Sequence, residues 1–176
     1  AVDSEILGKV VALLEKRQPE NNKLAYLRTR LAGFYSAENR PELAAIEYEK
    51  QLKGSTGKGN FRTYFDLAKV HVRQKKFEQA ASALIKALSM DDCQSAMAHQ
   101  RHPGNAKANL LIEPFMNAGK YDLLEKVLKK NIEFYKRSKV TPSDKALIET
   151  ALLAELYAKR KRYEEAKTLT DEIVKQ

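Results

Sequence analysis

One spacing pattern recurs along most of this chain and restricts its fold more than any other feature. A large residue precedes a small one, alanine comes twelve residues after the small residue, and a bulky residue follows four positions later. Two segments offset by 36 residues fit this pattern without gaps. The residues that fit it are Leu31, Ala32, Ala44 and Tyr48 in one segment, and Leu67, Ala68, Ala80 and Leu84 in the next. Such recurrence is typical of folds built from stacked copies of one unit.

Two looser copies of the pattern follow. They begin at Leu111 and Leu153, at further offsets of 44 and 42 residues. The additional length falls near residues 91–104 and 136–143, where we expect connections between units.

Apolar residues within each copy recur every three or four positions, which is the period of an amphipathic α-helix. Each copy therefore predicts two helices that cross closely at their small residues. One such hairpin cannot bury its own apolar stripe, so neighbouring hairpins must stack. We expect helices near residues 4–17, 24–38, 41–53, 60–74, 77–89, 105–118, 121–137, 143–160 and 163–175.

These segments resemble tetratricopeptide repeats (TPRs). Residues 61–92 match the family pattern best, and the other repeats lie at 24–53, 105–137 and 147–176. Two positions depart from the pattern: Pro41 replaces the aromatic residue at the turn, and Leu124 replaces a small residue. The residues that carry the best match are Tyr64, Leu67, Ala68, Phe77, Ala80 and Ala87.

The resemblance implies an all-α fold, a right-handed superhelix (α-solenoid) of antiparallel helix pairs. About four repeats form a single domain over residues 1–176, and segment 1–18 is an N-terminal helix that packs under the first repeat, as a cap or as half of an absent repeat. No apolar stretch approaches the ~20 residues of a membrane span. The compartment stays open, because cytoplasm and periplasm are both compatible with the sequence.

The formal net charge is +9. A positive balance attracts acidic peptides, nucleic acid or an anionic membrane surface, but an excess of lysine also serves solubility. The run from Lys159 to Arg162 resembles a nuclear-localisation signal. It also falls at a predicted helix end, where cations interact favourably with the helix dipole, and we prefer this interpretation. A second basic stretch, between Lys126 and Lys139, is spread over a helix face.

Two segments invite a chemical interpretation that their spacing does not support. The loop from Gly54 to Gly59 lacks the order of glycine, lysine and hydroxyl residue that a phosphate loop needs. Cys93, His99 and His102 match no common zinc module. The sequence has no recognised catalytic motif or cofactor loop. It therefore predicts a protein that is not an enzyme and holds no cofactor or metal.

In the family that the chain resembles, the first helices of the repeats line a concave face. The positions of this sequence that would face a partner there include Arg62, Phe65, Lys69, Arg73, Asn109, Met116, Asn117, Glu155 and Lys159. The cations among the first four suit an acidic peptide, and Phe65 suits an apolar anchor. Thr29 and Gly33 do not match the Lys and Asn clamp of the chaperone-binding subclass, which disfavours chaperone tails as ligands.

The predicted function is that of a non-enzymatic scaffold, which binds a peptide or protein partner in the concave groove. The alternative is an electrostatic binder of nucleic acid or another anionic surface through the basic helix faces. Nucleic acid is the less favoured partner, because no stacking aromatics are interleaved with the basic residues. A further option is self-association through exposed repeat ends, such as the last helix with Leu169, Ile173 and Val174.

Overall fold

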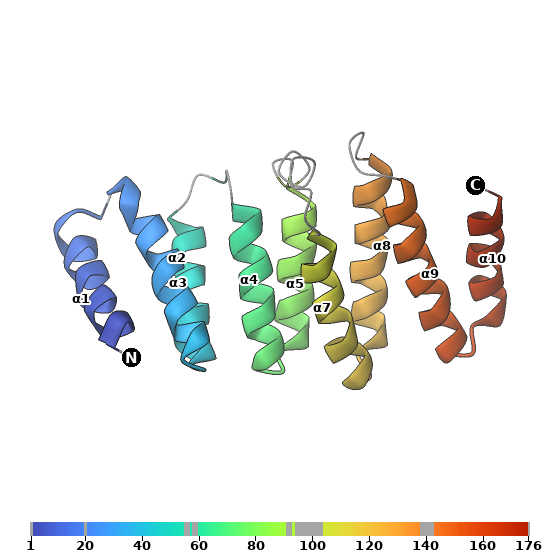
Figure 1. The fold of residues 1–176 in the computed structure, drawn as a ribbon, viewed down its shortest axis with the longest axis horizontal. Coiled ribbons are helices and arrows are strands. Elements are labelled where there is room, and N and C mark those ends of the chain that lie inside the picture. The colour runs from blue at the N-terminus through green and yellow to red at the C-terminus, as the bar shows by residue number, and fades with distance from the viewer. Residues whose placement is uncertain are drawn as a thin grey trace. The chain divides into compact units, whose positions relative to one another are not determined.

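A computed structural model describes residues 2–19, 21–54, 57, 60–90, 93, 104–137 and 143–175. The side chains of residues 2, 22, 104–110, 143 and 144 are outside this description. The described residues form nine α-helices (Figure 1), and each predicted helix is confirmed to within two residues at both ends. The helices are α1 (Val2–Arg17), α2 (Asn22–Ala37), α3 (Pro41–Lys53), α4 (Asn60–Arg73), α5 (Phe77–Leu88), α7 (Gly104–Asn117), α8 (Tyr121–Arg137), α9 (Ser143–Lys159) and α10 (Tyr163–Val174).

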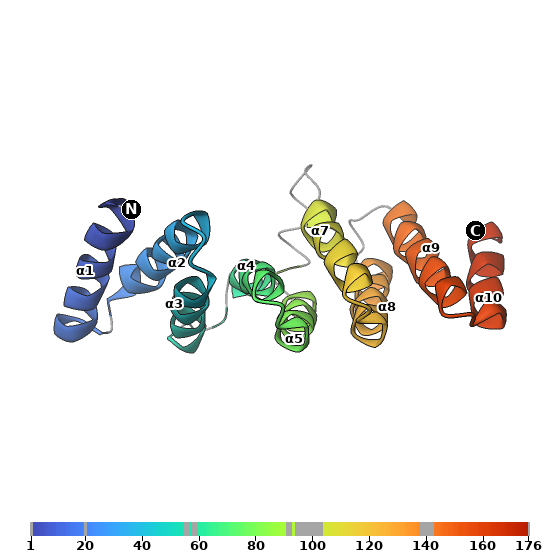
Figure 2. The same ribbon diagram turned by 90° about the horizontal axis from the view of Figure 1, so that it is seen from below.

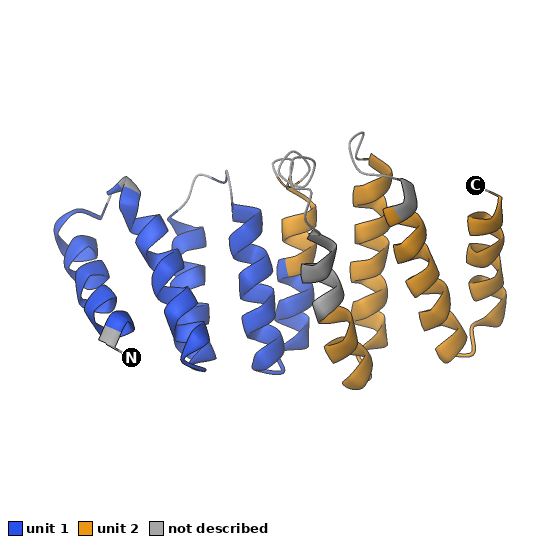
Figure 3. Ribbon diagram, in the orientation of Figure 1, with its two compact units in different colours: residues 1–83 blue, residues 84–176 orange. Residues whose placement is uncertain are grey.

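The helices are grouped in two compact units, residues 1–83 and 84–176, and the division falls within α5 (Figure 3). In unit 1, α1 packs on α2, α2 on α3, and α3 on α4. In unit 2, α7 packs on α8, α8 on α9, and α9 on α10. Both views of the ribbon show these partners side by side within each unit (Figure 2). The organisation of all repeats as one domain stays a prediction.

One type of turn joins the two helices of every repeat. The residue at its centre has a φ between +56° and +67°, and its own N–H donates to the carbonyl three residues earlier. The N–H of the next residue donates to the carbonyl five residues earlier, at 2.8–2.9 Å. This pair of bonds is the Schellman motif, which satisfies the free carbonyls at a helix end. The central residues are Asn39, Lys75, Gly119 and Lys161.

These four turns repeat at the offsets that the spacing pattern predicts. Residues 39, 75, 119 and 161 are separated by 36, 44 and 42 positions. The sequence pattern depends on apolar and small residues, whereas the turns are defined by backbone geometry. Agreement between the two shows that the described residues form four equivalent hairpins.

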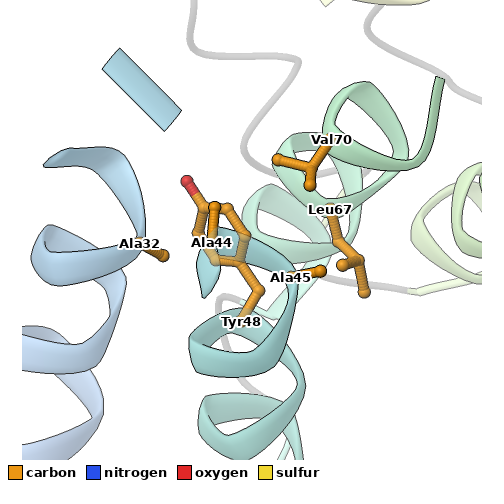
Figure 4. Close-up of a cluster of buried hydrophobic side chains, with 6 residues drawn as sticks. All are labelled: Ala32, Ala44, Ala45, Tyr48, Leu67 and Val70. Atoms are coloured by element: carbon orange, nitrogen blue, oxygen red, sulfur yellow. The ribbon is translucent and has the colours of Figure 1, made fainter. Parts of the chain in front are cut away.

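The core of unit 1 shows why small residues recur (Figure 4). Ala32 of α2 and Ala44 of α3 have no exposed surface, so the two helices approach each other closely there. Tyr48 of α3 is buried in the same cluster, and burial raises the pKa of its phenol to about 12. Leu67 and Val70 of α4 complete the cluster.

The terminal helices differ in how far they are buried. α1 packs on α2 through Val11, which joins Leu24 and Leu31 in a second apolar cluster. α10 has no buried residue between Tyr163 and Val174. In unit 2, α7 continues through Pro114, although proline cannot donate the hydrogen bond of a helix interior.

Candidate protein-binding groove

A groove of about 350 Å³ lies in unit 2 between α7 and α9, with α8 beneath it. Two buried leucines of α8, Leu124 and Leu128, form its floor. Apolar side chains of α7 and α9 form its walls, and polar side chains of the same helices form its rim. The lining residues are Ile112, Glu113, Met116, Asn117, Leu124, Leu128, Leu152, Glu155 and Lys159.

Helical spacing explains how these residues come together. Residues three or four positions apart share one face of a helix. Ile112 and Met116 are four apart on α7, and Leu152 and Glu155 are three apart on α9. Leu124 stands where the three other repeats have alanine, so its longer side chain supplies an apolar floor at this position.

The rim of the groove carries more negative than positive charge. Lys159 Nζ lies 3.1 Å from Glu155 Oε1, so these two charges neutralise each other. Glu113 is exposed, and the described residues include no cation paired with it. The groove therefore combines an apolar floor with one carboxylate that is available to a ligand.

The structure brings together four of the predicted partner-binding residues. Met116, Asn117, Glu155 and Lys159 all line the groove of unit 2. Asn109 lies in α7, but its side chain is outside the described residues. The sequence interpretation did not identify the groove floor, because residues of second helices were assigned to the core alone.

The predicted basic residues of unit 1 are already engaged. Arg73 Nη1 donates to the carbonyl oxygen and the hydroxyl of Ser36, at 3.0 and 2.9 Å. Lys69 Nζ lies 3.1 Å from Asp66 Oδ1. The Arg62 guanidinium lies over the Phe61 ring, 5.5 Å from its centroid. The three cations therefore do not form a preformed anion site.

The expectation of an exposed anchor at Phe65 requires a correction. Its side chain is only 4% exposed. Helix α4 buries more than one stripe, because Phe61, Phe65, Leu67 and Val70 are all buried along it. The ring of Phe65 is part of the core and does not face a ligand.

The basic run at the end of α9 takes part in an ion-pair cluster around Glu125 of α8. Arg162 Nη1 and Arg160 Nη1 lie 2.6 and 3.2 Å from Glu125 Oε2. Lys129 Nζ and the Tyr157 hydroxyl lie 2.7 and 3.0 Å from Glu125 Oε1. Burial alone raises the pKa of the Glu125 carboxyl, but hydrogen bonds from Lys129, Arg162 and Tyr157 outweigh burial and lower it to about 2.

A second carboxyl of unit 2, unlike Glu125, lies where no cation or hydroxyl of the described residues bonds to it. Glu149 of α9 is 1% exposed, and neither of its oxygens has a partner within hydrogen-bond geometry in the described part of the chain. Burial raises the pKa of this carboxyl, and the amide of Asn131 nearby lowers it in part. Burial also raises the pKa of Tyr135, and the Glu149 carboxyl contributes to that rise.

The cysteine–histidine segment is described only at Cys93, which is buried. His99 and His102 lie outside the described residues. Within the described ranges, no group of three His, Cys, Asp or Glu side chains is placed to hold a metal ion. The helices that the structure describes are all too short or too polar to cross a membrane.

The paired helices, the repeated turn and the groove define an all-α helical-repeat protein. Residues 61–92 match the family model of the tetratricopeptide repeat. Residues 61–92 are thus matched as a tetratricopeptide repeat in sequence, and the TPR-like fold is matched over nearly all of the chain. No curated protein sequence matches it.

Two solved structures are similar to the chain. One is a single-substitution variant of a Podosopora anserina protein with nearly identical TPR-like repeats, described as a kinesin light chain; it is 18% identical, with a TM-score of 0.59 over 97% of this chain and 82% of that one. The other is BtubC (BKLC) from P. vanneervenii, also 18% identical, with a TM-score of 0.55 over 98% of this chain and 72% of that one. At this identity the similarity establishes the fold.

Proposed function

We propose that the protein is a non-enzymatic scaffold, and that the groove of unit 2 binds an extended segment of a partner protein. Proteins built from tetratricopeptide repeats typically mediate protein–protein interactions. The observation that carries this proposal is the groove itself, where the predicted concave positions of α7 and α9 line one hollow above Leu124 and Leu128.

The groove also favours one class of ligand. Leu124 and Leu128 suit a bulky apolar side chain, since desolvated apolar anchors dominate the free energy of binding at interfaces. Glu113 suits a lysine or arginine next to that side chain. This differs from the acidic peptide predicted from Arg62, Lys69 and Arg73, because those cations have partners within unit 1.

The electrostatic alternative finds less support. Lys129 and Lys130 of α8 are paired with Glu125 and Glu133 at 2.7 and 3.0 Å. Such pairing reduces the positive potential of the basic helix face, on which attraction of an anionic surface depends. We therefore rank the binding of nucleic acid or an anionic surface second.

A peptide selection tests the proposal without the need to choose a partner beforehand. Random peptides displayed on phage are selected on the immobilised chain, and a selected peptide is titrated by fluorescence anisotropy. We expect selected peptides to share a bulky apolar residue beside lysine or arginine. Leu152→Lys puts a charge in the groove and should weaken binding at least tenfold, because the charge must be desolvated or displace the anchor.

Ala158→Lys is the matched control, since it adds the same charge to the exposed side of the same helix, outside the groove. It should leave the affinity within about twofold. Equal losses in the two variants, or selected peptides that are acidic and respond only to Arg62→Glu, would contradict the proposal. Recovery of nucleic acid whose binding falls steeply with salt would favour the electrostatic alternative.

A further inference from the structure

The outer side of α1 carries an apolar stripe that the described residues of the chain leave exposed. Ile6, Val10 and Leu13 are 57%, 42% and 50% exposed. Their spacing of four and three residues places them on one side of the helix. Leu7 and Val11 lie on another side, which packs on α2. α1 is therefore apolar on two sides, and only one of them is covered within unit 1.

No comparable stripe occurs on the other described helices. The large apolar side chains exposed on α2, α3 and α9 stand singly: Tyr26, Ile46 and Ile148. α10 exposes Tyr163 and Val174 at its two ends, but Lys167 and Thr170 lie between them on the same side. Single exposed apolar residues are common on protein surfaces, whereas a continuous stripe indicates a contact surface.

The charges at the ends of the stripe are complementary to each other. Asp3 lies three residues before Ile6, and Arg17 lies four residues after Leu13, so both extend the same side of the helix. An antiparallel pair of α1 helices centred on Val10 places Asp3 of each copy opposite Arg17 of the other. It also places Ile6 opposite Leu13. A parallel pair would instead place like charges together at both ends.

We infer that α1 associates with α1 of a second copy of this chain, as an antiparallel helix pair about a two-fold axis near Val10. A two-fold interface requires a surface that is complementary to itself, and the stripe with its two end charges meets this requirement. Lys9 flanks the stripe near the axis, and its charge is already matched by Glu5, 2.7 Å away.

The size of the surface sets the strength of this association. One helix from each copy covers less than the roughly 1,200 Å² of total area that stable interfaces bury. The dimer is therefore weak and reversible. It forms independently of the groove in unit 2, so loss of one function would leave the other intact.

Sedimentation equilibrium over a range of concentrations tests the inference. The native chain should change from monomer to dimer as its concentration rises. Val10→Glu should weaken the dimer at least tenfold, while Ile46→Glu, the same kind of change at a single exposed residue of α3, should leave it unchanged. Asp3→Arg and Arg17→Asp should each weaken it severalfold, and the two changes combined in one chain should restore it. Circular dichroism verifies that the helix content of each variant is native.

Cross-linking tests the position of the axis. Val10→Cys should give a disulfide-linked dimer under mild oxidation, because the axis brings the two copies of this residue together. The native chain should remain unlinked, since Cys93 is buried. A chain that stays monomeric at all concentrations, a dimer that withstands Val10→Glu, or a double charge reversal that fails to restore association would overturn the inference. So would open-ended oligomers, which would indicate contact between different surfaces.

Discussion

The hydroxyl of Tyr157 in α9 donates a hydrogen bond to the carboxylate of Glu125 in α8, 3.0 Å away, and so joins the third repeat to the fourth. The Arg162 guanidinium lies over the Tyr157 ring, 4.0 Å from its centroid, and also reaches Glu125. One carboxylate thus holds the start of α10 and the end of α9 against α8. The stability of the last repeat should therefore depend on the charge of Glu125.

Glu125→Gln tests this dependence. The folded state holds the pKa of Glu125 at about 2, below the ordinary value of 4.5. Its stabilising contribution is therefore fully present above about pH 4.5 and is lost as the pH falls towards 2. Since the side chain is only 14% exposed, the contribution at neutral pH is about 2–3 kcal/mol.

Urea denaturation between pH 2 and pH 7 measures this effect. The variant should be less stable than the native chain at pH 7, and the difference should shrink as the pH falls below 4.5. Glu133→Gln is the control, because that carboxylate pairs with Lys130 at the surface. A Glu125→Gln difference that stays constant over the whole pH range would contradict the assignment of the low pKa.

Glu149→Gln should change the stability of the folded state in the direction opposite to Glu125→Gln. Burial raises the pKa of Glu149 in the folded state. A raised carboxyl pKa means that the folded state binds more protons than the unfolded state, so stability is lost as the pH rises from the ordinary value of 4.5 through the folded pKa. Glutamine removes the ionisation and should stabilise the chain near neutral pH by about 1–3 kcal/mol.

Urea denaturation over the same range of pH distinguishes the Glu125 carboxyl from the Glu149 carboxyl. The gain from Glu149→Gln should disappear below pH 4.5, where the native carboxyl is protonated in both states. A loss of stability at neutral pH would mean that the charged form of Glu149 has partners that compensate for its burial.

Glycine at two positions gives a matched pair of predictions. An added Cβ at Gly33 or Gly119 meets no heavy atom within 4 Å, so steric contact does not distinguish the two sites. Gly119 has a φ of +67° at the centre of its turn, whereas Gly33 lies within α2. Gly119→Ala should cost about 1–2 kcal/mol because of backbone strain, and Gly33→Ala should gain about 0.5–1 kcal/mol from helix propensity. Thermal denaturation of both variants measures these changes in stability. A gain in both variants, or a loss in both, would contradict the predictions.

The helices and the repeat alignment could be predicted from the sequence because both depend on local signals. Apolar periodicity locates each helix, and small residues such as Ala32 and Ala44 mark the crossings. The bonds around Glu125 could not be predicted in this way. Its partners Arg160 and Arg162 are 35 and 37 residues further along the chain, and no local pattern selects one carboxylate among many.

The groove was predictable only in part, for a related reason. Its rim residues follow the spacing of first helices, so Met116 and Lys159 could be assigned to one face. The burial of Phe65 depends on how many sides of α4 its neighbours cover, which periodicity within α4 does not specify. The partners that Lys69 and Arg73 find in Asp66 and Ser36 likewise require the packed structure.

Leu124→Ala tests whether the Leu124 side chain belongs both to the core of unit 2 and to the floor of the groove. The side chain is 2% exposed and forms part of the groove floor, so truncation leaves a cavity beneath a bound ligand. The change should cost about 2–4 kcal/mol of stability. Ile148→Ala, at a side chain of α9 that is 50% exposed, should change stability by no more than about 1 kcal/mol. Urea denaturation of both variants measures these costs, and equal costs would mean that Leu124 is not a packed floor residue. Because the groove becomes deeper, peptides selected on the Leu124→Ala chain should carry larger apolar anchors than those selected on the native chain.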